Sequence, residues 1–166
     1  MSSLRLLSDT TASSVTSVSI TDVFTTDFDI YKITTYQEGF SGNTSIDGRF
    51  INSNGQIVTA SNYDLARMLQ KSDGTFTQER THTNGDFRSF GEADDDGSAS
   101  VSYIFNPMNS SSYTTMINQN ASGRGYMMKG IAILKQMTQI AGIEFFSDNG
   151  GTMTKFQCKI YGLRSS

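Results

Sequence analysis

The sequence predicts a single all-β domain, an antiparallel β-sandwich of the jelly-roll type, from three observations. Apolar and polar residues alternate in short runs that recur roughly every 8–12 residues, the spacing typical of sandwiches and barrels. Ser, Thr, Asn and Gly dominate the rest of the composition, and only 17% of the 166 residues are charged. No segment keeps the 3.6-residue period of an amphipathic helix over a useful length.

Four strands are expected in the first half of the chain. Residues 13–20 place valine and isoleucine among serine and threonine, and residues 28–37 (FDIYKITTYQ) alternate most clearly. Isoleucine and phenylalanine within residues 46–51 indicate the third strand, which ends at a Ser-Asn-Gly turn signal. Residues 63–71 fit either a helix or a strand, and their strand-like neighbours favour a strand.

In the second half, an apolar alternation predicts a strand that turns Val101, Tyr103 and Phe105 toward the core. Pro107, the chain's single proline, ends that strand because proline cannot donate to a β-ladder.

The C-terminal segment predicts a hairpin, with residues 143–146 and 153–163 on either side of a Gly-rich turn. Its second arm has a strict apolar face, so we expect this strand to lie inside a sheet although it nearly ends the chain. The expected division is an N-terminal arm at residues 1–12, the sandwich at 13–163 and a short tail at 164–166.

Charge and composition exclude several classes of function. A net charge of −3 and a pI near 5.0 disfavour nucleic-acid binding. No stretch approaches the ~20 apolar residues of a membrane-spanning helix. Cys158 is the single cysteine and cannot form an internal disulfide, which fits synthesis in a reducing cytosol.

Candidate catalytic and metal-binding motifs are weak. His82 is the only histidine and has no nucleophile motif near it, so an exposed histidine in a loop is expected. The Asp94–Asp96 run could attract a hard cation, but Tyr103 occupies the place of the glutamate that an EF-hand requires. Whether this loop binds a cation stays open. Paired carboxylates for glycoside cleavage also stay possible, although the chain has no tryptophan platform. We therefore expect no enzyme activity, no cofactor and no metal site.

Several segments, taken in order, resemble a family of small β-sandwich modules in the virion proteins of tailed phages. They are SVTSVSITDVFTTDFDIYKITTY, DGRFINSNG, ASNYDLA, SVSYIFNPMNSSSYTTMI and IAGIEFFSDNGGTMTKFQCKIYGL. The resemblance covers most of residues 13–163 and is specific as an ordered set. It implies a non-enzymatic structural role in the virion, such as a capsid decoration (cement) protein or part of a head or tail appendage.

The resemblance and the weakly charged surface together predict a homo-oligomer, by preference a trimer, that also contacts other virion proteins. The protein would be made in the host cytoplasm and reside in the virion. The expected partner-binding residues are three leucines of the N-terminal arm and three apolar residues phased outward on strands: Leu4, Leu6, Leu7, Tyr36, Ile104 and Tyr161. The alternative from another class is a module that binds glycans on the host surface.

Overall fold

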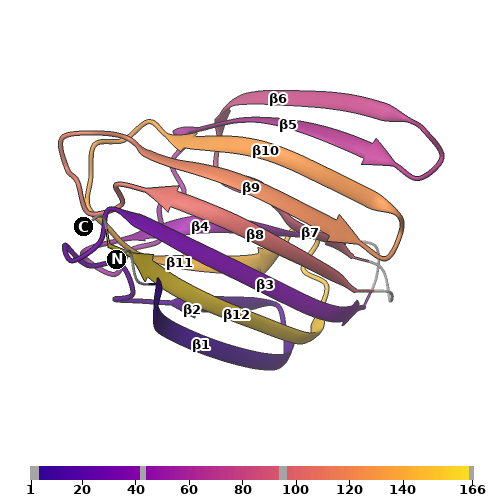
Figure 1. Cartoon of the computed structure of the whole chain (residues 1–166), viewed down its shortest axis with the longest axis horizontal. Helices are drawn as coiled ribbons and strands as arrows, with labels where there is room; N and C mark the ends of the chain where they lie inside the picture. Colours follow the sequence, from indigo (N-terminus) through magenta and orange to yellow (C-terminus); the bar gives the residue numbers. More distant parts are fainter. Residues whose placement is uncertain (1–3, 42–43, 94–96, 165–166) are drawn as a thin grey trace.

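The computed structural model describes residues 4–41, 44–93 and 97–164, which fold into one antiparallel β-sandwich (Figure 1). Within these ranges, twelve strands form two sheets. The large sheet has the order β1-β12-β3-β8-β9-β10-β5-β6, and the small sheet has the order β2-β11-β4-β7. The predicted all-β sandwich is confirmed.

The strands of the large sheet are β1 (Leu4–Val15), β3 (Ile30–Phe40), β5 (Tyr63–Lys71), β6 (Phe76–Asn84), β8 (Ser98–Phe105), β9 (Thr114–Ser122), β10 (Tyr126–Leu134) and β12 (Met153–Leu163). The strands of the small sheet are β2 (Ser17–Ile20), β4 (Thr44–Asn52), β7 (Phe87–Ala93) and β11 (Ile140–Ser147). Figure 1 shows the large sheet's strands side by side from β6 to β1, with the small sheet behind the part that contains β8, β3 and β12.

The chain crosses repeatedly between the two sheets, as in jelly rolls. It passes from β3 to β4, returns for the β5–β6 hairpin, crosses to β7, and returns for β8, β9 and β10. The predicted C-terminal hairpin is wrong, because the chain also crosses between the sheets at this point. β11 pairs with β2 and β4 in the small sheet, whereas β12 pairs with β1 and β3 in the large sheet. The turn between them carries the chain from one layer to the other.

The N-terminal arm expected at residues 1–12 is largely a strand of the sandwich. β1 begins at Leu4 and pairs antiparallel with β12 from Leu4↔Leu163 to Val15↔Met153, with one bulge between Leu6 and Ser8. The segment reads as an arm because its partly buried side chains, Leu7, Ser8, Thr10 and Ala12, do not form an apolar alternation. β1 places β12 inside the sheet, as its strict apolar face predicted.

Aromatic side chains form a continuous contact through the core between the sheets. Ring centroids are 4.7 Å apart for Phe50–Phe87, 5.4 Å for Phe87–Phe90, 4.8 Å for Phe90–Phe145 and 5.2 Å for Phe145–Phe156. All five side chains are essentially inaccessible to solvent. Tilted and edge-to-face pairs of this kind add about 0.5–1.5 kcal/mol each beyond area burial. The core therefore ties β4, β7 and β11 to β12.

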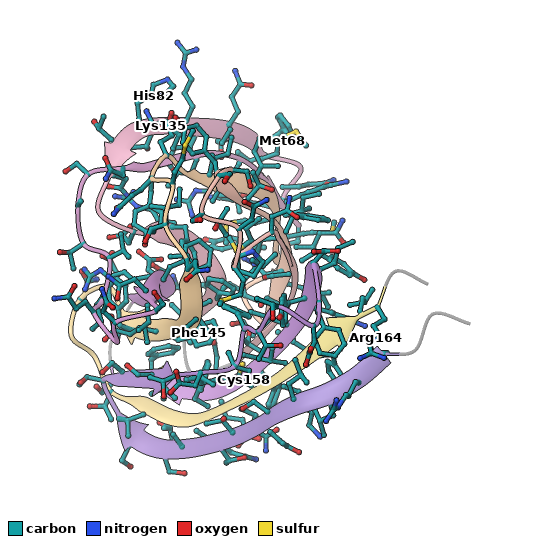
Figure 2. The ribbon with its side chains drawn as sticks, turned by 90° about the vertical axis from the view of Figure 1, so that its left-hand side faces the viewer. Met68, His82, Lys135, Phe145, Cys158 and Arg164 are labelled. Carbon is teal, nitrogen blue, oxygen red and sulfur yellow. The ribbon has the colours of Figure 1, made fainter. Side chains whose placement is uncertain are left out.

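Cys158 lies beside this core, as Figure 2 shows with Phe145 on the facing layer. The thiol is fully buried, and desolvation raises its pKa well above the ordinary value. Because the thiolate is the reactive species, Cys158 is an inert packing residue in the folded protein.

The expected phase of β8 is wrong by one residue. Val101 is 37% exposed and Tyr103 and Phe105 are half-buried, whereas Ile104 is completely buried. The sequence pattern pointed the larger apolar set inward, but the structure points it outward. Ile104 thus belongs to the core and is not an outward contact residue.

This inverted phase predicts unequal costs for two neighbouring substitutions. Ile104→Ala should lower the free energy of unfolding by about 2–5 kcal/mol, because it leaves a cavity between the sheets. Val101→Ala removes methyl groups already in contact with water and should cost less than about 1 kcal/mol. Urea unfolding of both variants measures the difference, and a larger loss for Val101→Ala would contradict the assigned phase.

Candidate interaction face

Buried polar side chains line the inner side of the large sheet where β3, β8 and β9 lie next to one another. The Oγ1 atom of Thr35 and the Oγ atom of Ser100 are 2.6 Å apart, and Asn118 Nδ2 donates to Ser102 Oγ at 2.8 Å. All four residues are buried. Polar groups removed from water are tolerated when they hydrogen-bond one another, so this polar seam is compatible with a position inside the sandwich.

The seam continues to Gln37, whose amide nitrogen donates to the hydroxyl of Ser98. Both side chains are buried beneath Gly91 of β7. A Cβ atom at position 91 would overlap the Gln37 amide and the Ser98 hydroxyl. Glycine is therefore required there, because it lets the small sheet approach the polar seam closely.

Because side chains alternate between the two faces of a strand, a polar inner face leaves the apolar side chains outside. Paired residues form one apolar row across the large sheet, starting with Leu6↔Tyr161 at the β1 edge. After Lys32 of β3, the row continues as Tyr103↔Ile117 and Ile117↔Ile131. We call Leu6, Tyr161, Tyr103, Ile117 and Ile131, together with Lys32 between the two tyrosines, the apolar row.

The apolar row is accessible on the outer face of the sheet. Leu6 is 49% exposed, Ile117 40% and Ile131 52%, while Tyr103 and Tyr161 are half-buried. Lys32 is the one charged residue within the row. Outward faces of antiparallel sheets are normally polar, so a row of this composition marks a surface suited to contact with another molecule.

Two hollows lie beside the apolar row on the same face. One has a volume of about 770 Å³ and is bordered by β10, β5 and β6, with Ala66, Met68, Arg80 and Ile131 among its lining. The other has a volume of about 380 Å³ and is bordered by β8, β9 and β10, with Ala99 and Ala121 among its lining. Both include Lys129, so they meet on β10.

A charged cluster lies at the end of the sheet near β6, where Figure 2 shows His82 and Lys135. One carboxylate oxygen of Asp64 lies 3.0 Å from Lys135 Nζ and 3.2 Å from His82 Nδ1, and the other accepts from the Thr83 amide at 3.1 Å. The Lys135 contact and then the Thr83 bond lower the pKa of Asp64 to about 2. His82 is exposed as expected, but it lies on β6 and not in a loop.

Among the six residues expected to bind partners, the structure brings some together. Leu4, Leu6 and Tyr161 meet on the outer face, because Leu4 pairs with Leu163 and Leu6 with Tyr161. Tyr36 is exposed on the same face, opposite Ala99. Leu7 lies at the bulge of β1 and packs against the core, so part of its surface is taken up by the fold.

The structure contradicts the prediction that Ile104 contacts a partner, because Ile104 is buried in the core. Sequence reasoning missed Tyr103, Ile117 and Ile131 as surface residues. The available signal was the complementary set in the same strands: Ser98, Ser100, Ser102, Asn118 and Asn120 also recur every second residue. A polar set of that regularity can form the inner face when its members hydrogen-bond to polar neighbours in the same sheet, as Ser100 does to Thr35 and Ser102 does to Asn118.

The described residues contain no group of three or more His, Cys, Asp or Glu side chains placed to hold a metal ion. The Asp94–Asp96 run falls outside those residues. In the part of the chain that the structure describes, no helix is long and apolar enough to cross a membrane.

No protein-family model and no curated protein matches the chain. Among solved structures, the PL-14 alginate lyase of Aplysia kurodai is similar at 11% identity and a TM-score of 0.37, over 87% of this chain and 72% of the lyase. The catalytic domain of PdAgaC is similar at 8% identity and a TM-score of 0.27, over 83% and 64%. The VP2 subviral particle of infectious bursal disease virus is similar at 9% identity and a TM-score of 0.12, over 100% and 42%. These likenesses are too low to carry an argument about function.

The charged cluster predicts a specific pH response. The pKa of Asp64 is lowered from 3.8 to about 2 in the folded protein, so its contacts stabilise the fold above pH ~4 and are lost as the pH falls toward 2. Carboxyl NMR titration of Asp64 measures this pKa directly. Lys135→Met should raise it toward 3.8, whereas Lys155→Met, which removes a partner of Glu38 instead, should leave it unchanged. An unchanged pKa in Lys135→Met would contradict the assignment.

Proposed function

We propose that this chain is a non-enzymatic structural module of a phage virion that assembles with further copies of itself. A capsid decoration protein or part of a head or tail appendage fits this role. The resemblance of the ordered sequence segments to virion modules supports the class of protein. The apolar row on the outer face of the large sheet is the observation that carries the assembly.

The energetics of the apolar row favour contact with another chain. Fully burying an isoleucine or leucine side chain contributes about 1.5–3 kcal/mol relative to leaving it in water. Leu6, Ile117 and Ile131 are each about half exposed, so a partner surface can still bury much of their area. A monomer gains nothing from this exposure.

The weak charge of the apolar row and of the whole chain allows a second copy of the protein to bind there. The apolar row includes one cation, Lys32, and no acidic residue, and the whole chain has a net charge of only −3. Repulsion between copies is therefore weak. The row also reaches β1, an edge strand of the large sheet, so a contact can continue from the sheet face onto the edge. A closed homo-oligomer, by preference a trimer, follows as the proposed state.

Sedimentation equilibrium of the purified chain tests self-assembly. The wild type should have a mass that is a multiple of 18.2 kDa, whereas Ile117→Glu should shift toward 18.2 kDa because it places a charge in the contact. Ile57→Glu is the matched control, since Ile57 is also 40% exposed but lies beside Ile51 of the small sheet. A monomeric wild type at high micromolar concentration would refute self-assembly in solution.

The virion location has its own test. Quantitative mass spectrometry of purified phage particles should detect the chain at many copies per particle. Washing at high salt should not remove it, because an apolar contact is not screened by ions. Absence of the chain from particles, in a lysate that contains it, would contradict the structural role.

A further inference from the structure

We propose that the outer face of the large sheet also holds a binding groove for a linear acidic polysaccharide. This inference goes beyond assembly, because an assembly module requires no carbohydrate ligand. It rests on the two hollows that meet at Lys129 and on the charges within them. The groove is defined here as these two hollows together, and it lies beside the apolar row.

The groove runs across the strands and suits an extended ligand. Its two hollows border β8, β9, β10, β5 and β6, which are consecutive neighbours in the sheet. Four strand spacings of ~4.8 Å make a length of roughly 19 Å. The two volumes, about 770 and 380 Å³, are each within the usual range for a ligand site. A polymer can pass along such a groove, whereas a compact ligand would fill only one end.

Small residues between larger ones create the hollow. Ala99 and Ala121 pair directly on the outer face, and Tyr36 and Met127 stand on either side of that pair. In the same way, Ala66 of β5 lies between Ile131 of β10 and Arg80 of β6. Methyl groups form an apolar floor, and the larger side chains form the walls. Such a surface can contact the C–H faces of sugar rings.

The groove carries positive charge that the rest of the molecule does not neutralise. Lys129 and Arg80 are exposed and have no ion-pair partner among the described residues. The acidic side chain at the groove, Glu79, is already bound, with Oε2 2.6 Å from Arg67 Nη2 and Oε1 3.2 Å from Arg88 Nη1.

Three other lysines on or next to the large sheet form ion pairs, unlike Lys129, whereas Lys32 within the apolar row has no ion-pair partner among the described residues. Lys155 Nζ lies 2.8 Å from Glu38, and Lys159 Nζ lies 3.1 Å from Asp9. Lys135 is paired with Asp64. In a chain of net charge −3, two unpaired cations in one groove are a local reversal of sign.

The spacing of these cations favours a polymer with repeated anionic groups. Lys129 is opposite Met68 on β5, and Met68 is opposite Gln78 on β6, two residues from Arg80. Two strand spacings and a two-residue offset place the two backbone positions roughly 12 Å apart. One carboxylate or sulfate group cannot bridge that distance comfortably, but separate groups along a polysaccharide can contact both side chains.

Neutral amides complete the chemistry that a sugar requires. Gln119 and Gln78 are exposed in the groove, and each can donate to and accept from hydroxyl groups. Nucleic acid fits less well, because Lys129 and Arg80 are the unpaired cations there, and Tyr36 at the wall next to Ala99 is the one aromatic ring that the groove offers for base stacking.

Affinity electrophoresis of the full chain in gels containing polygalacturonate, dextran sulfate or neutral dextran tests the proposal. At least one acidic polymer should retard the protein, and neutral dextran should not. Lys129→Glu should weaken the retarding affinity about tenfold or more. Lys159→Glu, an equal charge change on the same face outside the groove, is the matched control and should have a clearly smaller effect.

A second variant separates a shaped groove from general attraction between charges. Ala121→Leu leaves the charge unchanged, fills the floor, and should also reduce affinity several-fold; circular dichroism checks that the variant folds. Equal effects of Lys129→Glu and Lys159→Glu, no effect of Ala121→Leu, or equal retardation by double-stranded DNA would each overturn the proposal. Ile117→Glu leaves the residues that line the groove unchanged. If this variant is monomeric but is still retarded by the acidic polymer, polysaccharide binding does not depend on self-assembly, and the two proposals can be judged independently.

Discussion

The polar seam between the two sheets is the constraint on which the rest of the surface depends. Thr35 and Gln37 of β3 hydrogen-bond to Ser100 and Ser98 of β8, Asn118 of β9 hydrogen-bonds to Ser102, and Gly91 of β7 leaves space for Gln37 and Ser98. A strand has only two faces, so fixing the serines and asparagines inside fixes valine, tyrosine and isoleucine outside. The apolar row is thus a direct consequence of how the interior is filled.

The core is stabilised in two different ways along the large sheet. Near β12, aromatic and aliphatic packing dominates, with Phe145 against Phe156 and Cys158 fully buried beside them. Near β8 and β9, hydrogen bonds between buried side chains replace part of that packing, although Gln37 Oε1 is buried without a hydrogen-bond partner among the described residues. Hydrogen bonds are directional, so the seam also favours one register of these strands over a slip by one residue, which would bury the apolar side chains instead.

The outer face of the large sheet combines two chemistries. The apolar row is continuous with the edge strand β1 and can be covered by another chain. The groove beside it keeps two unpaired cations and exposed amides toward solvent. The two areas touch at Ile131, which belongs to the apolar row and lines one hollow. Assembly and ligand binding can therefore take place on one face of the same subunit.

The sequence by itself determined the all-β class, the sandwich architecture, the strand at residues 63–71 and the interior position of β12, because alternation and turn residues are local signals. Only the tertiary structure decided the rest. Alternation shows that a strand has two unlike faces but does not show which one meets a partner layer, so the phase of β8 required knowing that β7 packs over its serine face, where Gly91 lies over Ser98. The N-terminal strand likewise needed its partner: Ser and Thr positions become strand positions when β12, more than a hundred residues away, supplies the ladder.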